Sequence, residues 1–168
     1  MTSHYPKFLE NLHRLVAMPS ISSANPALDM SNAHVINYLA ECFEGLGFSC
    51  EIIQSPATSG KNKLNLVATR GHGPGGLVLS GHTDTVPLDE SLWTVDPFAL
   101  TEKDNRLYGL GSTDMKGFFP VVMQAIRELG DFECREPLIV LATADEETSM
   151  QGARTLVEQG IPRARSAI

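Results

Sequence analysis

The sequence predicts a layered α/β fold built on a largely parallel sheet. Three observations carry this prediction. Strand-like apolar runs alternate along the chain with segments whose apolar residues recur at helical spacing. Residues 137–144, PLIVLATA, are apolar almost throughout, which is typical of a strand covered on both faces. The length of 168 residues and the 42% hydrophobic content suit one domain with a substantial core.

The first third of the chain predicts two helices and a strand. Residues 5–18 carry apolar side chains at helical spacing, and the following residues, 19–30, form a loop by composition. A second helix follows Ser31, which is a suitable capping residue, and it ends at the glycines of the stretch EGLG. Residues 48–54 then have the composition of a strand.

The middle of the chain predicts a pair of strands and a long irregular segment. Residues 55–63 are a turn-rich connection. Residues 64–70 and 76–82 follow as two strands. Residues 89–107 are irregular in pattern, with room for one short hairpin.

The last third predicts two helices and two strands. Residues 117–130 form a helix in which Pro120 is tolerated because it lies near the start. The buried strand 137–144 follows, and then a short helix at 153–160. Residues 165–168 resemble the opening of a further strand, so we expect this chain to be a truncated piece of a larger domain.

Charge and composition exclude several classes of partner. The formal net charge is −7, from 20 acidic and 13 basic residues, which argues against a nucleic-acid or anionic-membrane partner. No apolar stretch approaches the roughly 20 residues of a membrane span. The N-terminal residues lack the basic start and unbroken apolar run of a secretory signal, and the three cysteines are scattered. We therefore expect a cytoplasmic protein without disulfides or thiolate metal sites.

Three polar clusters follow predicted strands. They are GHTD at 81–84, GSTDMKG at 111–117, which follows a predicted short strand at 107–110, and TADEET at 143–148. Each has an ordinary structural explanation: a structural histidine, a helix-capping aspartate and a solvated acidic loop. Sites in open α/β sheets nevertheless gather beyond the carboxyl ends of the strands, so the clusters should converge. One imidazole among several carboxylates suits zinc, cobalt or manganese.

The spacing within two clusters suggests separate roles for neighbouring residues. His82 and Asp84 lie two apart, so in an extended chain they point to the same side. This allows Asp84 to hold the far ring nitrogen of His82. Glu146 and Glu147 are adjacent and point apart, so one can bind a metal while the other faces a water molecule as general base.

The clusters carry three motifs of a known family. In this chain the motifs are His82-x-Asp84-x-x-Pro87, Asp114-x-Lys116-Gly117 and Asp145-Glu146-Glu147. With them the chain resembles the M20-type dinuclear zinc amidohydrolases, from its first helix to its last residue. The stretches MPSISS, ALDMSN, GHTDTVP and WTVDPFALTEKDNRLYGLGSTDMKGFF are similar to the branch that deacetylates acetylornithine. The resemblance implies a three-layer α/β/α fold with a largely parallel mixed sheet, and two divalent metal ions, zinc or cobalt.

The resemblance also implies a role for each site residue. His82 would bind one metal ion, Glu147 would bind the other, and Asp114 would bridge the two. Glu146 would be the general base that takes a proton from the attacking water and later protonates the leaving amine. Asp84 would orient His82. The resemblance further implies a cis peptide bond directly after Asp114.

The implied reaction is metal-dependent hydrolysis of the N-acetyl amide of N2-acetylornithine to ornithine and acetate, in arginine biosynthesis. Related activities remain open, among them succinyl-diaminopimelate desuccinylase, aminoacylase and glutamate-releasing carboxypeptidase, because the metal motifs act on the scissile bond rather than on the side chain. In each case the partner is a small N-acylated amino acid. A non-catalytic binding domain derived from a truncated hydrolase is the alternative outside enzymes.

The chain departs from the family in length. Family members carry a further acidic ligand, a further histidine ligand and an inserted lid domain that supplies dimer contacts, and these are absent here. We therefore expect residues 1–168 to be the N-terminal portion of the metal-binding catalytic domain of a protein that is a homodimer at full length. Each metal ion would have two protein ligands where catalytic zinc usually has three. Weak metal binding and little or no activity are expected of these residues alone.

Overall fold

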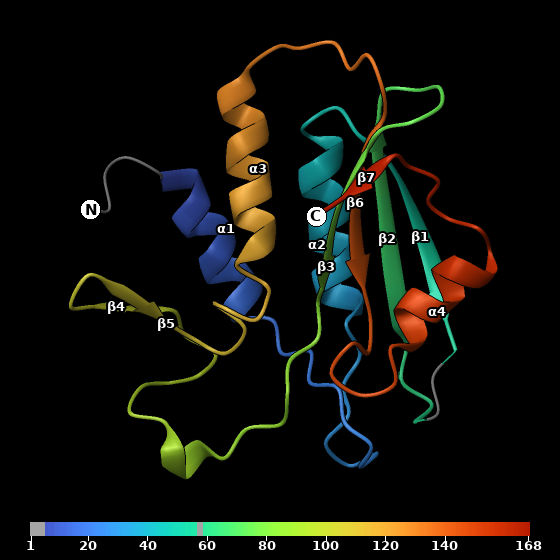
Figure 1. Cartoon of the computed structure of the whole chain (residues 1–168). Helices are drawn as coiled ribbons and strands as arrows, with labels where there is room; N and C mark the ends of the chain where they lie inside the picture. Colours follow the sequence, from blue (N-terminus) through green and yellow to red (C-terminus); the bar gives the residue numbers. More distant parts are fainter. Residues whose placement is uncertain (1–5, 57–58) are drawn as a thin grey trace.

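The computed structural model describes residues 6–56 and 59–168. Its centre is a five-stranded sheet in the order β1-β2-β6-β3-β7, and a separate two-stranded hairpin is formed by β4 and β5 (Figure 1). The strands are β1 (Ser49–Ser55), β2 (Lys63–Arg70), β3 (Leu77–His82), β4 (Thr101–Lys103), β5 (Arg106–Tyr108), β6 (Leu138–Thr143) and β7 (Ser166–Ala167). Tyr5, where the first helix was expected to start, and residues 57 and 58 of the turn-rich connection lie outside the described residues.

Helices cover both faces of the five-stranded sheet, as Figure 1 shows. The helices are α1 (Pro6–Val16), α2 (Ala33–Glu44), α3 (Phe118–Leu129) and α4 (Gln151–Glu158), with a short 3₁₀ helix at Glu90–Leu92. Side chains of α1, α2 and α3 form one apolar cluster with the sheet, and α4 contributes Leu156 to a second cluster. The predicted three-layer α/β/α arrangement is therefore confirmed.

The strands alternate their side chains between the two clusters. In β2, Leu66 and Ala68 join the cluster under α1 to α3, while Val67 joins the cluster under α4. Strand β6 also alternates its side chains between the two clusters, and it is buried along all but its first residue. This confirms the prediction that the run PLIVLATA is a strand covered on both faces, because a strand between two helical layers has no solvent-facing side.

The directions in which the strands pair differ from the prediction of a largely parallel sheet. Strands β2 and β3 do not pair with each other, because β6 lies between them. The pairs β1–β2 and β2–β6 are antiparallel, whereas β3–β6 and β3–β7 are parallel. The sheet is thus evenly mixed rather than largely parallel. Strand β6 takes the central place because its continuous apolar sequence suits a position with neighbours on both edges.

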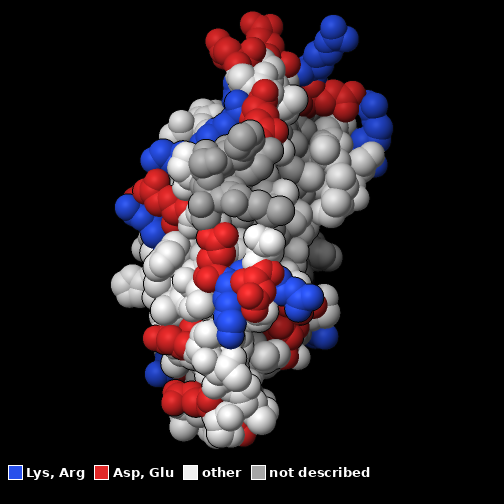
Figure 2. All heavy atoms as spheres, turned by 90° about the vertical axis from the view of Figure 1, so that its left-hand side faces the viewer, with Lys and Arg blue, Asp and Glu red and all other residues white. Residues whose placement is uncertain are grey.

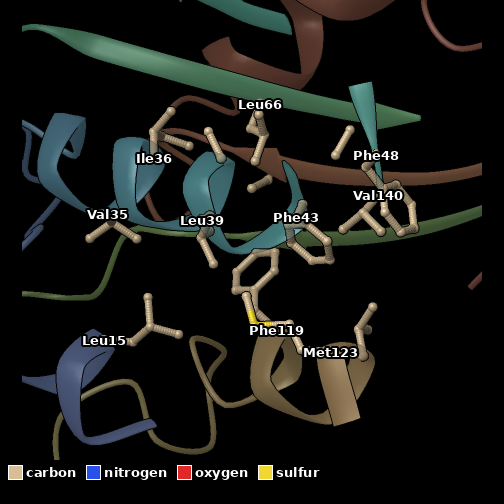
Figure 3. Packing of buried hydrophobic residues seen from close by; sticks show 14 of the residues in the cluster. Leu15, Val35, Ile36, Leu39, Phe43, Phe48, Leu66, Phe119, Met123 and Val140 are labelled. Carbon is tan, nitrogen blue, oxygen red and sulfur yellow. The ribbon is translucent and has the colours of Figure 1, made fainter. Parts of the chain in front are cut away.

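The larger core lies between the sheet and the first three helices (Figure 3). Helix α2 forms because its apolar residues recur at helical spacing, and they give it one buried face. In Figure 3, Leu39 and Phe43 of this helix lie between Leu66 of the sheet and Phe119 of α3. Phe43 also packs edge to face against Phe48, with ring centroids 5.5 Å apart.

The start of α2 is close to the predicted position but is built differently. Asn32 occupies the capping position, and its side chain bonds the main chain of Leu64 on β2, with Nδ2 donating to the carbonyl at 2.8 Å. Ser31 lies one residue earlier, and its hydroxyl oxygen accepts the N–H of Ala33 at 3.2 Å. The side chain of Asn32 therefore fixes the start of α2 against the sheet.

The outer surface carries charges of both signs. On the face shown in Figure 2, acidic and basic side chains lie intermixed. Among the described residues, no helix has the length and apolar character needed to cross a membrane.

Candidate metal centre

The carboxyl ends of β3 and β6 bring two of the three polar clusters together. The strands are parallel, and their last residues, His82 and Thr143, stand side by side in the sheet. The N–H of Thr83 donates to the carbonyl of Thr143 at 2.9 Å, which extends the pairing one residue beyond the strands. The loop after β3 and the loop after β6 therefore leave the sheet at one edge, as the sequence predicts.

His82, Asp114 and Glu147 converge at this edge. Each offers one ligand atom, and these atoms all lie within 4.8 Å of one another. The ring nitrogen Nε2 of His82 lies 3.0 Å from Oδ1 of Asp114. His82 is 5% exposed, whereas the side chain of Asp114 is 75% exposed. One imidazole nitrogen and two carboxylates are a donor set that zinc or cobalt accepts, so the residues present fit a divalent cation.

Asp114 lies in the loop between the β4–β5 hairpin and α3, and Lys116 anchors that loop. The peptide bond between Asp114 and Met115 is cis. The Nζ of buried Lys116 donates to the carbonyls of Leu15 at 3.2 Å and Met18 at 2.6 Å, where α1 ends. Burial lowers the pKa of Lys116 to about 8. The lysine satisfies carbonyls that a helix end leaves free, and it ties the Asp114 loop to α1.

Asp84 contacts His82, but through a different atom from the one we expected. Nδ1 of His82 lies 3.0 Å from the main-chain carbonyl oxygen of Asp84 and 3.7 Å from the carboxylate oxygen Oδ1. A carbonyl can only accept a hydrogen bond, so Nδ1 is the donor here, and in the neutral ring this places the proton on Nδ1 and the lone pair on Nε2. This tautomer leaves Nε2, the nitrogen that faces Asp114, free to bind a metal.

The carboxylate of Asp84 holds the acidic turn instead. Its two oxygens accept the N–H groups of Glu146 at 3.2 Å and Glu147 at 3.0 Å. Burial raises the pKa of Asp84, although these hydrogen bonds act in the opposite direction. Asp84 thus joins the loop after β3 to the loop after β6, a role that the sequence did not reveal.

Negative charge accumulates at this edge of the sheet. Burial raises the pKa of Glu147, and the charge of Asp114 adds to this effect. The carboxylate oxygen Oε2 of Glu146 lies 3.9 Å from Nε2 of His82, too far for a hydrogen bond, and the side chain is exposed. Several carboxylates around one imidazole repel one another, and a divalent cation would relieve the repulsion.

A cavity of about 710 Å³ adjoins the candidate metal ligands. Asp114 and Glu147 line it, together with Trp93, Tyr108 and Leu110. This size and largely apolar lining are typical of sites for small molecules. Sequence reasoning missed the cavity because its walls come from loops that are far apart along the chain.

Sequence reasoning also missed a buried lysine near the centre. Lys63, Asp29 and Asp145 form an ion-pair network beneath the acidic turn. The sequence placed Lys63 in a turn-rich connection and Asp29 in a loop, where charged residues are usually solvated. No local pattern distinguishes a lysine that becomes buried from one that stays at the surface.

The family model described as peptidase family M20/M25/M40 matches residues 78–167. The chain is 53% identical over 158 residues to the acetylornithine deacetylase of Klebsiella pneumoniae (strain 342), covering 94% of this chain and 41% of that protein. It is 51% identical over 168 residues to the acetylornithine deacetylase of Salmonella newport (strain SL254), covering 100% of this chain and 43% of that protein. The chain spans about two fifths of the length of these curated relatives.

Solved structures agree with the fold. An M20 family metallo-carboxypeptidase from Sulfolobus solfataricus is 25% identical, with a TM-score of 0.79 over 96% of this chain and 36% of that chain. Human carnosine dipeptidase 1 is 24% identical, with a TM-score of 0.82 over 98% of this chain and 38% of that chain, a likeness of fold alone. Since the family model covers more than half of its residues, this chain belongs to peptidase family M20/M25/M40.

Proposed function

We propose that this chain is part of a metal-dependent amidohydrolase that converts N2-acetylornithine and water to ornithine and acetate, a step of arginine biosynthesis. The observation that carries the proposal is the convergence of His82, Asp114 and Glu147 at one edge of the sheet. The identity of 51–53% to proteins named acetylornithine deacetylase supports this choice of substrate.

In this proposal the three residues hold two divalent cations, zinc or cobalt. His82 would hold one cation, Glu147 would hold the other, and Asp114 would be shared between them. When bound, the cations would polarise the acetyl carbonyl and lower the pKa of a nearby water molecule. The carbonyl of Asp84 holds His82 in the tautomer that this binding requires.

Glu146 moves the proton. Its carboxylate accepts a proton from the attacking water as the new carbon–oxygen bond forms. It then delivers that proton to the amine nitrogen as the amide carbon–nitrogen bond breaks, which balances the reaction. The position of Glu146 supports this role, because its side chain is exposed beside the cluster and no hydrogen bond engages it within the described residues.

The cavity beside Asp114 and Glu147 is the proposed place for the substrate's amino-acid part. Trp93 and Tyr108 give it aromatic walls against which the apolar part of the substrate would pack. The proposed partner is therefore a small N-acylated amino acid.

We further propose that residues 1–168 are the N-terminal portion of the catalytic domain. The remaining metal ligands, the lid and the dimer contacts would then come from segments outside this sequence. The coverage of about two fifths of each curated relative supports this division. The 168 residues alone are expected to bind metal weakly and to show little or no turnover, because each metal ion would have two protein ligands.

The product of the complete reading frame tests the proposal. It is assayed with zinc or cobalt on acetylornithine, succinyl-diaminopimelate and N-acetylated neutral amino acids. We expect the highest kcat/KM for acetylornithine, and a loss of about 10²–10⁴-fold in kcat for Glu146→Gln with metal content unchanged. Glu158→Gln, a change of an exposed residue of α4, is the matched control and should retain full activity.

Other outcomes would overturn the proposal in different ways. A preference for another acyl amino acid would move the protein to a different branch of the family. Metal binding without turnover of any substrate would favour a binding role. Full activity of Glu146→Gln would remove Glu146 from the mechanism.

A further inference from the structure

A buried lysine connects the acidic turn to a distant loop. Lys63 is the first residue of β2 and is 1% exposed. Its Nζ lies 2.7 Å from Oδ1 of Asp145 and 2.8 Å from Oδ1 of Asp29. Asp145 directly precedes Glu146 and Glu147, so this cation lies against the base of the turn that carries both glutamates.

The backbone of Asp145 determines the shape of the acidic turn. This residue has a φ of 57°, in the left-handed region that residues other than glycine seldom adopt. Its carbonyl accepts the N–H groups of Ser149 at 3.1 Å and Met150 at 2.7 Å. The directions in which Glu146 and Glu147 leave the chain therefore depend on how firmly Asp145 is held.

Hydroxyl groups complete the surroundings of the Asp145 carboxylate. The hydroxyl of Ser22 donates to Oδ1 of Asp145 at 2.8 Å. The same hydroxyl oxygen lies 2.8 Å from Oγ1 of Thr148, within the turn. The carboxylate of Asp145 is thus fixed by a lysine and a serine that lie far from it in sequence.

The carboxylate of Asp29, the other partner of Lys63, is also held by hydrogen bonds. Oδ1 of Asp29 accepts the N–H of Ser23 at 3.0 Å, and Oδ2 accepts the hydroxyl of Ser59. Burial acts to raise the pKa of Asp29, but the hydrogen bonds from Lys63, Ser59 and Ser23 and the charge of Lys63 together outweigh it and leave that pKa below its ordinary value. Asp29 therefore stays ionised and keeps Lys63 in place.

The turn is consequently held from two directions. The carboxylate of Asp84 accepts the N–H groups of Glu146 and Glu147, and Lys63 binds the side chain of Asp145. Buried ion pairs add little to stability compared with apolar side chains of similar size. The network of three buried charges beside the proposed ligands is therefore better explained by its effect on the geometry of the acidic turn than by a gain in stability.

We propose that Lys63 is a positioning residue of the metal centre. Acting through Asp145, it fixes the turn that presents Glu147 as a metal ligand and Glu146 as the base. The inference deepens the proposed function and rests on the metal centre described there. Lys63 itself touches neither the cluster nor the substrate cavity.

The test compares Lys63→Met with Lys61→Met, an exposed lysine two residues earlier. Both changes are made in the product of the complete reading frame, at a temperature at which circular dichroism shows the native fold. Without metal, we expect the amides of Ser149 and Met150 to exchange at least about 10-fold faster in Lys63→Met. With cobalt, we expect its affinity to fall by about 10–100-fold, the usual effect of losing an outer partner of a metal ligand. Lys61→Met should match the wild type.

A second variant covers the case in which Lys63→Met fails to fold. Asp145→Asn keeps the pair between Lys63 and Asp29, and it should produce the same two changes. If Lys63 acts through Asp145, the double variant should lose no more cobalt affinity than the more affected single variant.

Two results would count against the proposal separately. If exchange at Ser149 and Met150 and cobalt affinity match the control while only the free energy of unfolding falls, Lys63 is an ordinary structural ion pair. If the wild type binds no cobalt, the proposed function fails, and the exchange rates still decide whether Lys63 holds the turn.

Discussion

The imidazole of His82 is constrained at both of its nitrogens. Nδ1 donates to the carbonyl of Asp84, and Nε2 faces the carboxylate of Asp114. The carboxylate of Asp84 is engaged elsewhere, by the amides of Glu146 and Glu147. Asp84 therefore binds the imidazole of His82 through its main-chain carbonyl and the acidic turn through its carboxylate. A mutation of the side chain can separate these two roles.

Asp84→Asn should affect the turn and leave the imidazole tautomer unchanged. The amide side chain has one oxygen where two N–H groups need acceptors, so one buried donor loses its partner. The free energy of unfolding should fall by about 1–3 kcal/mol, measured by urea denaturation. Nitrogen NMR of His82 should still find the proton on Nδ1. A proton that moves to Nε2 would show that the carboxylate, and not the carbonyl, sets the tautomer.

Asp29 should contribute to the acid sensitivity of the fold. Its pKa is lower in the folded chain than its ordinary value of 3.8, so the unfolded chain binds the proton more tightly. The stabilisation from this group is present above that value and is lost as the pH falls through the folded pKa. In urea denaturation across the acid range, Asp29→Asn should lose stability less steeply than the wild type below about pH 4. Parallel curves would contradict this assignment.

At the scale of single residues, the sequence predicted which residues lie close together but not which of their atoms make contact. The two-residue spacing placed Asp84 near His82. The choice between carbonyl and carboxylate depends on the backbone path after β3, which no local pattern encodes. Lys63 could not be predicted either, since its burial depends on two loops that fold over it from elsewhere in the chain.

Among the elements, β6 has the greatest effect on the architecture. Its ladder with β2 is antiparallel and its ladder with β3 is parallel, so it joins the two halves of the sheet. Periodicity predicted each of these strands because it is a local property. It could not predict their order, because the short connection between β2 and β3 gives no sign that a strand from residues 138–143 enters between them.

The core beneath α2 should be sensitive to the loss of single side chains. Leu39 is fully buried between the sheet and α3, so Leu39→Ala should cost about 2–5 kcal/mol in the free energy of unfolding. Leu92→Ala removes the same atoms from an exposed position and should change the free energy by less than about 0.5 kcal/mol. Equal effects in chemical denaturation would contradict the assignment of α2 to the core.

The first turn of α4 lies against the end of β6 with no space for a side chain. A Cβ added at Gly152 would lie 2.4 Å from the carbonyl oxygen of Ala144 and 2.6 Å from Oδ1 of Asn65. Gly152→Ala should therefore destabilise the fold by about 1–3 kcal/mol in denaturation measurements. Gly45→Ala is the control, since its added Cβ would meet nothing closer than 3.4 Å. A neutral effect of Gly152→Ala would show that α4 can move away from the sheet.

At the scale of the whole molecule, three distant segments meet at one edge of the sheet. Sequence reasoning could predict the meeting of the loops that carry His82 and Glu147, because the carboxyl ends of the parallel strands β3 and β6 share an edge. Asp114 follows the separate β4–β5 hairpin, so its place at this edge could not be predicted in the same way. The structure brings His82, Asp114 and Glu147 together, while their roles as ligands stay predictions. The adjoining cavity and the Lys63 network could not be predicted, because both arise only when loops of the folded chain come together.

The most direct test of the account is a cobalt titration of the product of the complete reading frame, followed by absorption and calorimetry. The central claim is that His82, Asp114 and Glu147 bind a divalent cation. We predict saturable binding to the wild type and to His72→Ala, a change of an exposed histidine, and binding at least about 10-fold weaker to His82→Ala. Equal binding to all three proteins, or no saturable binding to any of them, would contradict the claim.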